Sequence, residues 1–220
     1  MTHFGLDDLP RWARDFGLEL TDHQAAQFRC YLDLLLTWNR RVALVSQQRP
    51  DEIVCKHFAD SLVAASLCRS TERVADLGSG AGFPGLPIAI ARPEAEVAMI
   101  EANRKKVSFL LNAIAQAGIG NARVLEGRLE KLAVKSELKA RFSLVISRAL
   151  SDLREFLELA APFLAANGRA IAMKGPRYKE ELDGVREART GAELRFELVA
   201  VTPYRLPDGA ERVLLSFRFT

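Results

Sequence analysis

Glycine is concentrated in one short stretch of the chain, residues 76–85, which reads Asp-Leu-Gly-Ser-Gly-Ala-Gly-Phe-Pro-Gly. An apolar run at 73–77 leads into this stretch, and a helical pattern follows it. Glycine allows a sharp turn and lets a ligand approach the backbone without a Cβ in the way. A glycine-rich turn between a strand and a helix lies at the carboxyl edge of an α/β sheet, where ligands bind. The stretch therefore predicts a ligand-binding loop.

Two ligands compete for this loop. The spacing Gly80-x-Gly82-x-x-Gly85 matches the dinucleotide fingerprint. Asp76 argues against a dinucleotide, because a carboxylate before the first glycine, Gly78, would repel a pyrophosphate. The same carboxylate suits S-adenosylmethionine, which carries an ammonium and a sulfonium and no phosphate. We interpret Asp76, Gly78 and Gly80 as parts of a methyl-donor loop, with a turn that binds no ligand as the remaining alternative.

Glu101 lies 23 positions after Gly78, at the end of the next apolar run. An acid at that position can accept hydrogen bonds from both ribose hydroxyls of a nucleoside cofactor. Because NAD and S-adenosylmethionine share a ribose, Glu101 supports a nucleoside cofactor without choosing between them. The alternative is an exposed acid that caps the following helix.

The order of apolar runs and helical patterns predicts the fold that must position these residues. Short apolar runs alternate with helical stretches from residue 72 onward, which favours an α/β protein with an open, mostly parallel, Rossmann-like sheet. Two further runs near the end predict a hairpin that adds an antiparallel edge. The predicted strands are 73–77, 96–100, 122–125, 142–146, 169–173, 194–201 and 212–219, and two of the predicted helices are 105–117 and 153–164.

Residues 1 to about 70 read as helical, without strand-like alternation. Leu32, Leu35 and Leu36 recur at helical spacing, and Pro50 opens another helix with acids in its first turn. We therefore expect an N-terminal helical extension over 1–70 and a methyltransferase domain over 71–220, packed as one globular unit.

Composition excludes several classes of protein. Hydrophobic residues make up 49% of the 220 residues, enough for a core, and no apolar run approaches the ~20 residues that span a bilayer. The first residues do not resemble a signal peptide, so a cytoplasmic protein is expected. The net charge of +3 permits an RNA partner without demanding one.

Cysteine and histidine spacing gives no sign of a metal site. No two cysteines form a C-x-x-C pair, and the histidines show no H-x-x-x-H spacing. We expect the three cysteines to be buried thiols; they are Cys30, Cys55 and Cys68.

The residues after the fourth predicted strand limit the target of methylation. That strand ends in Ser147-Arg148-Ala149-Leu150. This is not the Asn/Asp-Pro-Pro-aromatic loop common in amino-group methylation, and no cysteine beyond residue 68 could serve cytosine C5 chemistry. Guanine N7 fits, because this uncharged ring nitrogen carries a free lone pair. It can attack the sulfonium methyl group without first losing a proton. Catalysis would then consist mostly of positioning and exclusion of water, with no general base.

The extended loop at 76–87 closely resembles that of the RsmG (GidB) family. These are bacterial methyltransferases that act on guanine N7 in the 530 loop of 16S ribosomal RNA. The Phe-Pro-Gly-x-Pro extension is more specific than the glycines alone. The likeness covers roughly residues 28 to 175, and four other segments agree with it: Trp38-Asn39, 56–62, Ser147-Arg148-Ala149 and Met173-Lys174-Gly175.

The resemblance implies a class I methyltransferase sheet and a specific set of site residues. The cofactor would lie at Gly78, Phe83, Glu101, Leu129, Glu130 and Arg148, with the adenine ring near Leu129 and Glu130. Arg148 and Lys174 would position the substrate from the ends of adjacent strands. The partner would be 16S rRNA or the small ribosomal subunit, bound by a monomer. A basic cluster that could grip RNA backbone, or form a solvated helix face, is Arg104, Lys105 and Lys106.

Two further points concern the first 70 residues. We expect His57 and Asp60 to form a buried structural pair, because the reaction requires no imidazole. The segment Ala43-Leu44-Val45-Ser46 departs from the Asn-Leu-Thr stretch usual in the family, which leaves the substrate less secure than the cofactor.

Three other functions remain open. The first is an S-adenosylmethionine-dependent methyltransferase that acts on another RNA or on a small molecule, in the latter case with the helical extension as a lid. The others are an RNA-binding assembly factor with a vestigial cofactor loop, and a dehydrogenase. The two acids Asp76 and Glu101 speak against the assembly factor, and Asp76 speaks against the dehydrogenase.

Overall fold

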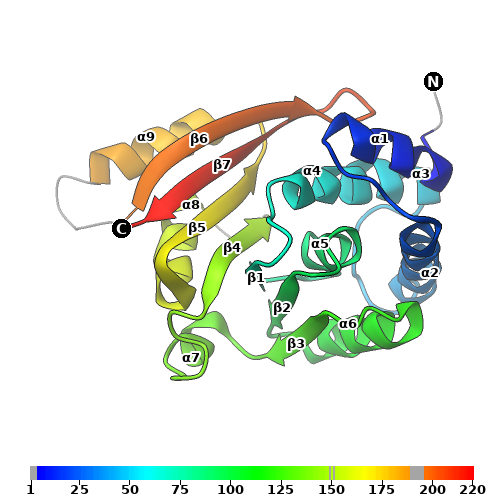
Figure 1. Cartoon of the computed structure of the whole chain (residues 1–220), viewed down its shortest axis with the longest axis horizontal. Coiled ribbons are helices and arrows are strands. Elements are labelled where there is room, and N and C mark those ends of the chain that lie inside the picture. The colour runs from blue at the N-terminus through cyan, green and yellow to red at the C-terminus, as the bar shows by residue number, and fades with distance from the viewer. Residues whose placement is uncertain (1–3, 149, 151, 189–195) are drawn as a thin grey trace.

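The computed structural model describes residues 4–148, 150, 152–188 and 196–220. Within these residues a seven-stranded sheet has the order β3-β2-β1-β4-β5-β7-β6 (Figure 1). Strands β1 to β5 are parallel, and β7 lies antiparallel between β5 and β6. The predicted α/β, mostly parallel sheet with an antiparallel edge is confirmed. The strands are β1 Arg73–Leu77, β2 Glu96–Glu101, β3 Ala122–Glu126, β4 Phe142–Arg148, β5 Leu164–Lys174, β6 Phe196–Arg205 and β7 Glu211–Phe219.

Helices cover both faces of the sheet. The helices α1 to α6 pack on one face and α7 to α9 on the other, as Figure 1 shows. The α-helices are α1 Leu9–Asp15, α2 Asp22–Asn39, α3 Pro50–Ile53, α4 Asp60–Ser66, α5 Gly85–Ala91, α6 Arg104–Ala117, α7 Leu129–Ala133, α8 Leu153–Ala160 and α9 Tyr178–Ala188. Shorter pieces are the 3₁₀ turns η1 Leu6–Asp8 and η3 Ala161–Phe163, and the π-helical segment η2 Val54–Ala59.

Alternation along the strands explains the two layers. Val74 joins the core beneath α1 to α6, while its neighbour Ala75 joins the core beneath α7 to α9. Leu144 and Val145 divide in the same way on β4. Successive strand residues point to opposite faces, so a strand buried on both faces needs apolar residues at every position. This is why the central strands read as continuous apolar runs.

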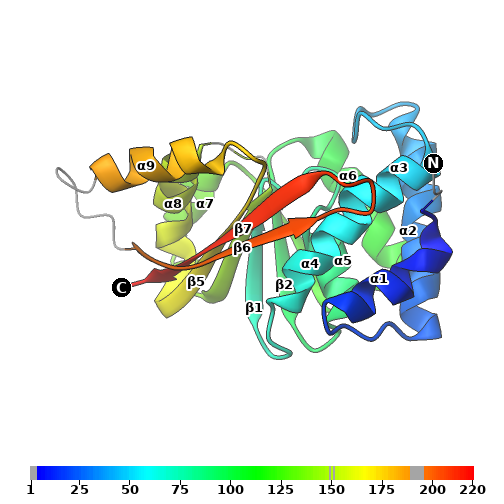
Figure 2. The ribbon, with the colours of Figure 1, turned by 90° about the horizontal axis from the view of Figure 1, so that it is seen from above.

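The first helices share a core with the sheet. Helix α2 begins with a capping box, in which Thr21 Oγ1 accepts from Gln24 N and Gln24 Oε1 accepts from Thr21 N. Its buried side includes Phe28 and Tyr31, which belong to the same hydrophobic cluster as Val74 of β1. Figure 2 shows α1, α2 and α4 gathered on the side of the sheet away from α9. None of the described helices is long and apolar enough to cross a membrane.

The structure corrects the predicted boundaries at the end of the chain. The helix predicted over 153–164 ends at Ala160, and a 3₁₀ turn containing Pro162 leads into β5. Proline lacks the N–H that an interior helix position needs. The strand predicted at 194–201 is observed from Phe196, with 194 and 195 outside the described residues, and it continues through Pro203 to Arg205. Proline is tolerated there because β6 is the edge strand.

The cysteines are only partly as expected. Cys55 and Cys68 are buried, but Cys30 is half-buried. Cys30 sits on α2 beside the fully buried stripe rather than within it, since Phe28 and Tyr31 carry the contacts to the core.

A change at Tyr31 tests how far α2 supports the glycine-rich loop. The phenol is fully buried and donates to the Ala81 carbonyl at 2.6 Å. Tyr31→Phe keeps the ring stacked on Phe58 but leaves that carbonyl without its donor. We expect the free energy of unfolding, measured in urea, to fall by about 1 to 2 kcal/mol. Unchanged stability would show that the loop does not depend on this bond.

Candidate functional site

The loop between β1 and α5 is shaped by backbone conformations that only glycine adopts readily. Gly78, Gly80 and Gly82 have φ values of 70°, 58° and 99°, all in the left-handed region. A Cβ on Gly82 would lie 2.6 Å from the Leu86 side chain, and one on Gly78 would lie 2.5 Å from Leu150. At Gly80 the nearest atom would be 3.8 Å away. The loop is therefore packed at its two ends and open at Gly80.

Asp76 lies beneath this loop rather than facing solvent. Its side chain is completely buried, and Oδ2 accepts a hydrogen bond from Gly85 N at 3.0 Å. Oδ1 has no hydrogen-bond partner among the described residues. Burial raises the pKa of Asp76 to about 7, because the charged form loses its hydration. The carboxylate thus holds the first residue of α5 onto the end of β1.

This bond bears on the choice of ligand. A dinucleotide site presents the N–H groups of the following helix to a pyrophosphate. Here Gly85 N, the third glycine of the apparent dinucleotide spacing, already donates to Asp76. Because this N–H is taken by a protein carboxylate, it is not available to a ligand phosphate.

Glu101 reaches the open side of the loop from the end of β2. Its Oε2 accepts from Gly80 N at 2.9 Å and its Oε1 from Asn103 N at 2.8 Å. The next strand, β3, continues this edge, because Glu101 pairs in register with Glu126. Directly after β3 come Leu129, which is half-buried, and Glu130, which is exposed. The structure therefore aligns Gly80, Glu101 and the start of α7 along one edge.

Arg148 is held in place at the end of β4. Its Nη1 donates to Asp60 Oδ2 at 3.2 Å and to the Lys56 carbonyl at 3.3 Å. Its guanidinium carbon lies 5.0 Å from the centroid of the Phe83 ring, a cation–π arrangement. The hydroxyl of Tyr204, on β6, donates to Asp60 Oδ1 at 2.6 Å. The buried carboxylate of Asp60 thus joins the guanidinium to a phenol from the far end of the chain.

The expected pairing of His57 with Asp60 is wrong. The imidazole instead stacks on Phe83, with ring centroids 4.9 Å apart, and its Nε2 lies 2.8 Å from Gln47 Oε1. Asp60 is occupied by Arg148 and Tyr204. Burial first, and then the charge of Arg148, lower the pKa of His57 to about 3, so the imidazole is neutral near pH 7.

The divergent segment 43–46 is shaped by Asn39. The Asn39 Oδ1 accepts from Leu44 N and Val45 N, and its Nδ2 donates to the carbonyls of Val45 and Gln47. These bonds involve only the backbone of the segment, so different side chains can occupy the same path. The loop carries Gln47 to His57. In the sequence, Asn39 was marked only as part of the Trp38-Asn39 pair that agrees with the family.

Gln47 and Tyr204 were missed by sequence reasoning. Neither belongs to a recognisable motif, and Tyr204 is 144 positions from the carboxylate that it contacts. Gln47 reaches Phe83 through His57, and Tyr204 reaches it through Asp60 and Arg148. Spacing along the chain carries no signal for such contacts.

The remaining predicted cations lie on the same edge. Lys174 ends β5, and its Nζ is 2.7 Å from Glu181 Oε2. Strand register places Met173 beside Arg148, so Lys174 comes one residue beyond it. Arg104 opens α6 and pairs with Glu126 at 3.1 Å, and the two lysines after it, 105 and 106, are exposed and half-buried respectively. Ala149 of the predicted Ser-Arg-Ala motif lies outside the described residues.

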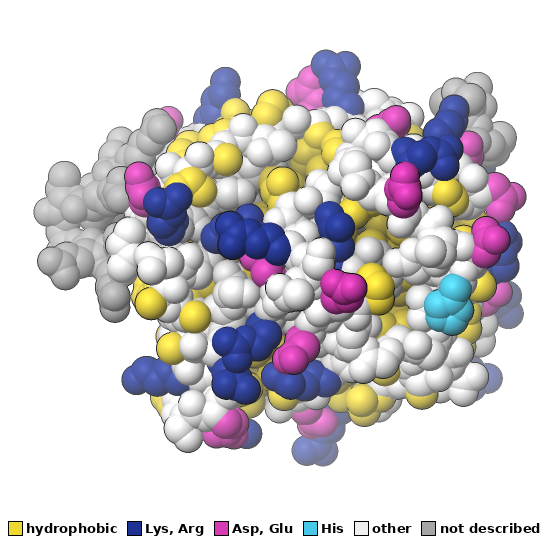
Figure 3. Space-filling model, in the orientation of Figure 1, with side chains coloured by type: hydrophobic (Ala, Val, Ile, Leu, Met, Phe, Trp, Pro, Cys, Tyr) yellow, Lys and Arg dark blue, Asp and Glu magenta, His cyan; other side chains and the backbone are white. Residues whose placement is uncertain are grey.

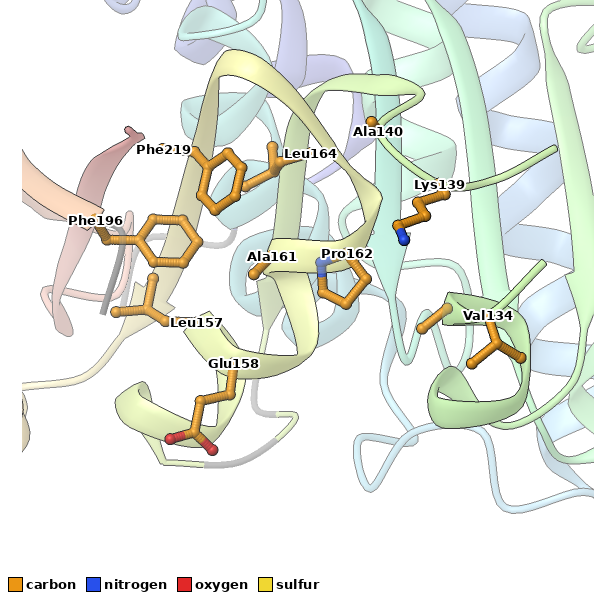
Figure 4. Close-up of a pocket in the computed structure, with 11 residues that line it drawn as sticks. Val134, Lys139, Ala140, Leu157, Glu158, Ala161, Pro162, Leu164, Phe196 and Phe219 are labelled. Carbon is orange, nitrogen blue, oxygen red and sulfur yellow. The ribbon is translucent and has the colours of Figure 1, made fainter. Parts of the chain in front are cut away.

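A hollow lies at the opposite edge of the sheet, where the parallel strands begin (Figure 4). Its volume is about 740 Å³, and its walls include Leu164 at the start of β5, Phe196 at the start of β6 and Phe219 at the end of antiparallel β7. It contains none of the residues singled out in the sequence. Within the described residues no group of three or more His, Cys, Asp or Glu side chains could hold a metal ion.

Comparison with known proteins agrees with this geometry. The GidB family model, described as rRNA small subunit methyltransferase G, matches residues 24–201. The chain belongs to this family. Curated relatives named ribosomal RNA small subunit methyltransferase G include one from Deinococcus radiodurans, 37% identical over 98% of this chain and 85% of the relative. Another, from Geobacter sulfurreducens, is 36% identical over 96% of both chains.

Solved structures of lower identity share the fold. M. jannaschii TYW2 in complex with AdoMet superposes with a TM-score of 0.56 at 19% identity, over 74% of this chain and 76% of that one. A SAM-dependent methyltransferase from Aquifex aeolicus gives a TM-score of 0.56 at 16% identity, over 78% and 94%. The fold of this GidB-family chain is therefore the Rossmann-like methyltransferase fold.

The buried imidazole of His57 predicts a dependence of stability on pH. The folded pKa of about 3 lies below the ordinary 6.5, so between these values the unfolded chain binds a proton that the folded protein does not. The contribution of His57 to the free energy of unfolding therefore falls as pH drops below about 6.5. Asp76 acts in the opposite direction, since its folded pKa of about 7 favours the folded state at low pH.

Urea unfolding of the wild type and of His57→Phe at pH 7.5 and 5.0 separates the contribution of His57 to the pH dependence of stability from that of Asp76. Asp76 is present in both proteins, so only the His57 contribution differs. We expect the wild type to lose more stability on acidification than the variant. An equal change in both would show that His57 is not shielded from protonation.

The Asp60 carboxylate is predicted to be essential for the arrangement around Arg148. The side chains of Asp60 and Arg148 are 4% and 18% exposed, so Asp60→Asn leaves a largely buried guanidinium without its counter-charge. We expect the free energy of unfolding to fall by about 2 to 4 kcal/mol. Adding Arg148→Met should restore part of the loss, because it removes the unpaired charge. No recovery in the double variant would contradict this role of Asp60.

Proposed function

We propose that this chain transfers a methyl group from S-adenosylmethionine to N7 of a guanosine in the 530 loop of 16S ribosomal RNA. The observation that carries the proposal is the bond from Gly85 N to the buried Asp76, which leaves an open glycine turn unsuited to phosphate next to Glu101. Membership of the rRNA small subunit methyltransferase G family supports the substrate class. The proposed substrate form is 16S rRNA or the small ribosomal subunit, met by a monomer in the cytoplasm.

The charges around the loop favour S-adenosylmethionine, which supplies a methyl group on a sulfonium. Gly78 and Gly80 provide the close backbone approach, and the Glu101 carboxylate is placed to accept from a ribose diol. We propose that Leu129 and Glu130 border the adenine ring. Glu101 beside the turn, together with the ionised form of Asp76 below it, attracts a cation and repels a pyrophosphate.

The groups beyond the loop are suited to holding a substrate rather than to moving a proton. Guanine N7 presents an uncharged lone pair, so the reaction needs alignment and exclusion of water. Phe83 and the neutral His57 form a stacked, largely apolar wall. Arg148 is fixed over Phe83 by Asp60, and we propose that it and Lys174 orient the guanine edge or its phosphate.

A small-molecule methyltransferase using the same cofactor is the alternative. The two functions are separated by the acceptor of the methyl group. We therefore incubate the protein with S-adenosylmethionine labelled in its methyl group and with naked 16S rRNA, small ribosomal subunits or a small-molecule extract. We expect label in RNA at guanine N7. Label confined to small molecules would overturn the substrate assignment.

Cofactor choice and the part played by Arg148 are tested alongside. Titration calorimetry should show binding of S-adenosylmethionine and none of NAD; the reverse would overturn the methyl-donor loop.

Arg148→Lys keeps a positive charge near Asp60 but loses the planar fork over Phe83. We expect transfer to fall at least ~10-fold with an unchanged circular dichroism spectrum. Near-normal turnover would remove Arg148 from the site.

A further inference from the structure

A groove adjoins the proposed site. It is an open hollow of about 470 Å³ between the start of α9 and the β6–β7 hairpin. Gly175 and Tyr178 line one side, and Tyr204 and Arg212 line the other. Figure 2 shows α9 beginning just beyond the end of β5, with the hairpin running beside it. No residue proposed above as a cofactor ligand lines this groove.

Strand register makes the groove continuous with the proposed site. Lys174 pairs with Val213 of β7, and Gly175 is therefore the first residue past the end of this ladder. Tyr204 pairs with Arg212 across the hairpin and forms part of the groove wall. The hydroxyl of the same Tyr204 binds Asp60, which holds Arg148. A chain lying in the groove would lead directly to the guanidinium over Phe83.

The walls of the groove are cationic. Lys179, Arg205 and Arg212 line it together with one acid, Glu211, which gives a net charge of three minus one, or +2. Arg205 pairs with Glu211 at 2.7 Å, but their side chains are 72% and 60% exposed. Exposed pairs contribute about 0 to 1 kcal/mol, so a phosphate can compete for Arg205. On the face drawn in Figure 3, Lys and Arg side chains are spread among Asp and Glu side chains.

The same walls carry one aromatic ring and two proline rings. Tyr178 is half-buried at the start of α9, and Pro176 and Pro203 lie on the two sides of the groove. Aromatic rings beside cations are the combination that binds single-stranded nucleic acid, with bases stacked on rings and phosphates on cations. The hollow in Figure 4 differs, since its charged walls are one lysine, Lys139, and one glutamate, Glu158.

We propose that this groove binds the single-stranded RNA that flanks the target guanosine. The backbone phosphates lie against Lys179, Arg205 and Arg212, and a flanking base stacks on Tyr178. The inference rests on the proposed function, because it assigns a path for the RNA from the site where the methyl group is transferred. It adds residues of α9 and of the C-terminal hairpin to the substrate contacts.

The experiment neutralises two exposed cations of the groove. Lys179→Gln, Arg205→Gln and the double variant are assayed for methylation of small ribosomal subunits or 16S rRNA, whichever substrate the wild type prefers. We expect the KM for RNA to rise roughly 10-fold in the double variant, with kcat and the Kd for S-adenosylmethionine within twofold of wild type. The slope of log KM against log salt should fall by about 0.7 for each phosphate that the variant no longer neutralises.

A matched control uses exposed lysines at the opposite edge. Lys135→Gln with Lys139→Gln removes the same charge away from the groove, and its KM should equal that of the wild type. A second variant tests stacking: Tyr178→Leu should raise the KM, and Tyr178→Phe should restore it. An unchanged KM in the cation double variant, or an equal rise in the control, would overturn the proposal that this groove binds RNA.

Direct RNA binding separates this inference from the proposed function. A fluorescent single-stranded RNA oligonucleotide is titrated against the wild type, the cation double variant and the lysine control. Weaker binding by the cation variant alone, with no methylation of RNA by the wild type, would overturn the proposed function and leave the groove as an RNA site. Methylation of RNA with equal binding by all three proteins would overturn only the groove.

Discussion

The hydrogen bond from Gly85 N to the buried carboxylate of Asp76 is the constraint on which the site depends. It closes the turn between β1 and α5 and uses the helix N–H that a phosphate would otherwise bind. The turn is then held from above by Tyr31, whose hydroxyl binds the Ala81 carbonyl, and from the side by Glu101, which binds Gly80 N. The loop is therefore fixed where it meets the core, while Gly78 and Gly80 remain partly accessible. The preference for a cationic donor follows from this arrangement.

Phe83 links the glycine-rich loop to Arg148, which we propose orients the substrate. Its ring contacts both the imidazole of His57, with centroids 4.9 Å apart, and the guanidinium of Arg148, 5.0 Å from the centroid. Each neighbour is fixed by a second residue, His57 by Gln47 and Arg148 by Asp60. Burial lowers the pKa of the imidazole, and the guanidinium is held against the Phe83 ring. These groups therefore form a largely dehydrated surface whose side chains are already in place. Such a surface suits an acceptor that needs alignment and no proton removal.

The helices before β1 and the β6–β7 hairpin at the edge of the sheet complete the site from opposite ends of the chain. The Lys56 carbonyl and Asp60 come from η2 and α4, whereas Tyr204 comes from β6. Leu206 and Ala210, in the turn of the hairpin, pack in the same hydrophobic core as the N-terminal helices. The N-terminal helices and the β6–β7 hairpin therefore meet around Asp60 and Arg148. Their meeting point also borders the groove that we assign to RNA.

The sequence by itself determined the order of strands and helices, the glycine turn, the type of ligand and the family. These features are encoded locally, in strand and helix periodicity, in glycines that adopt positive φ, and in the charge of Asp76. The end of α8 was misjudged because the preference of Pro162 competes with a continuing apolar pattern. Only the tertiary structure decided that Asp60 binds Arg148 and Tyr204 rather than His57, and that Gln47 holds the imidazole. A polar side chain takes the partner that packing brings to it, and packing between distant segments leaves no trace in local spacing.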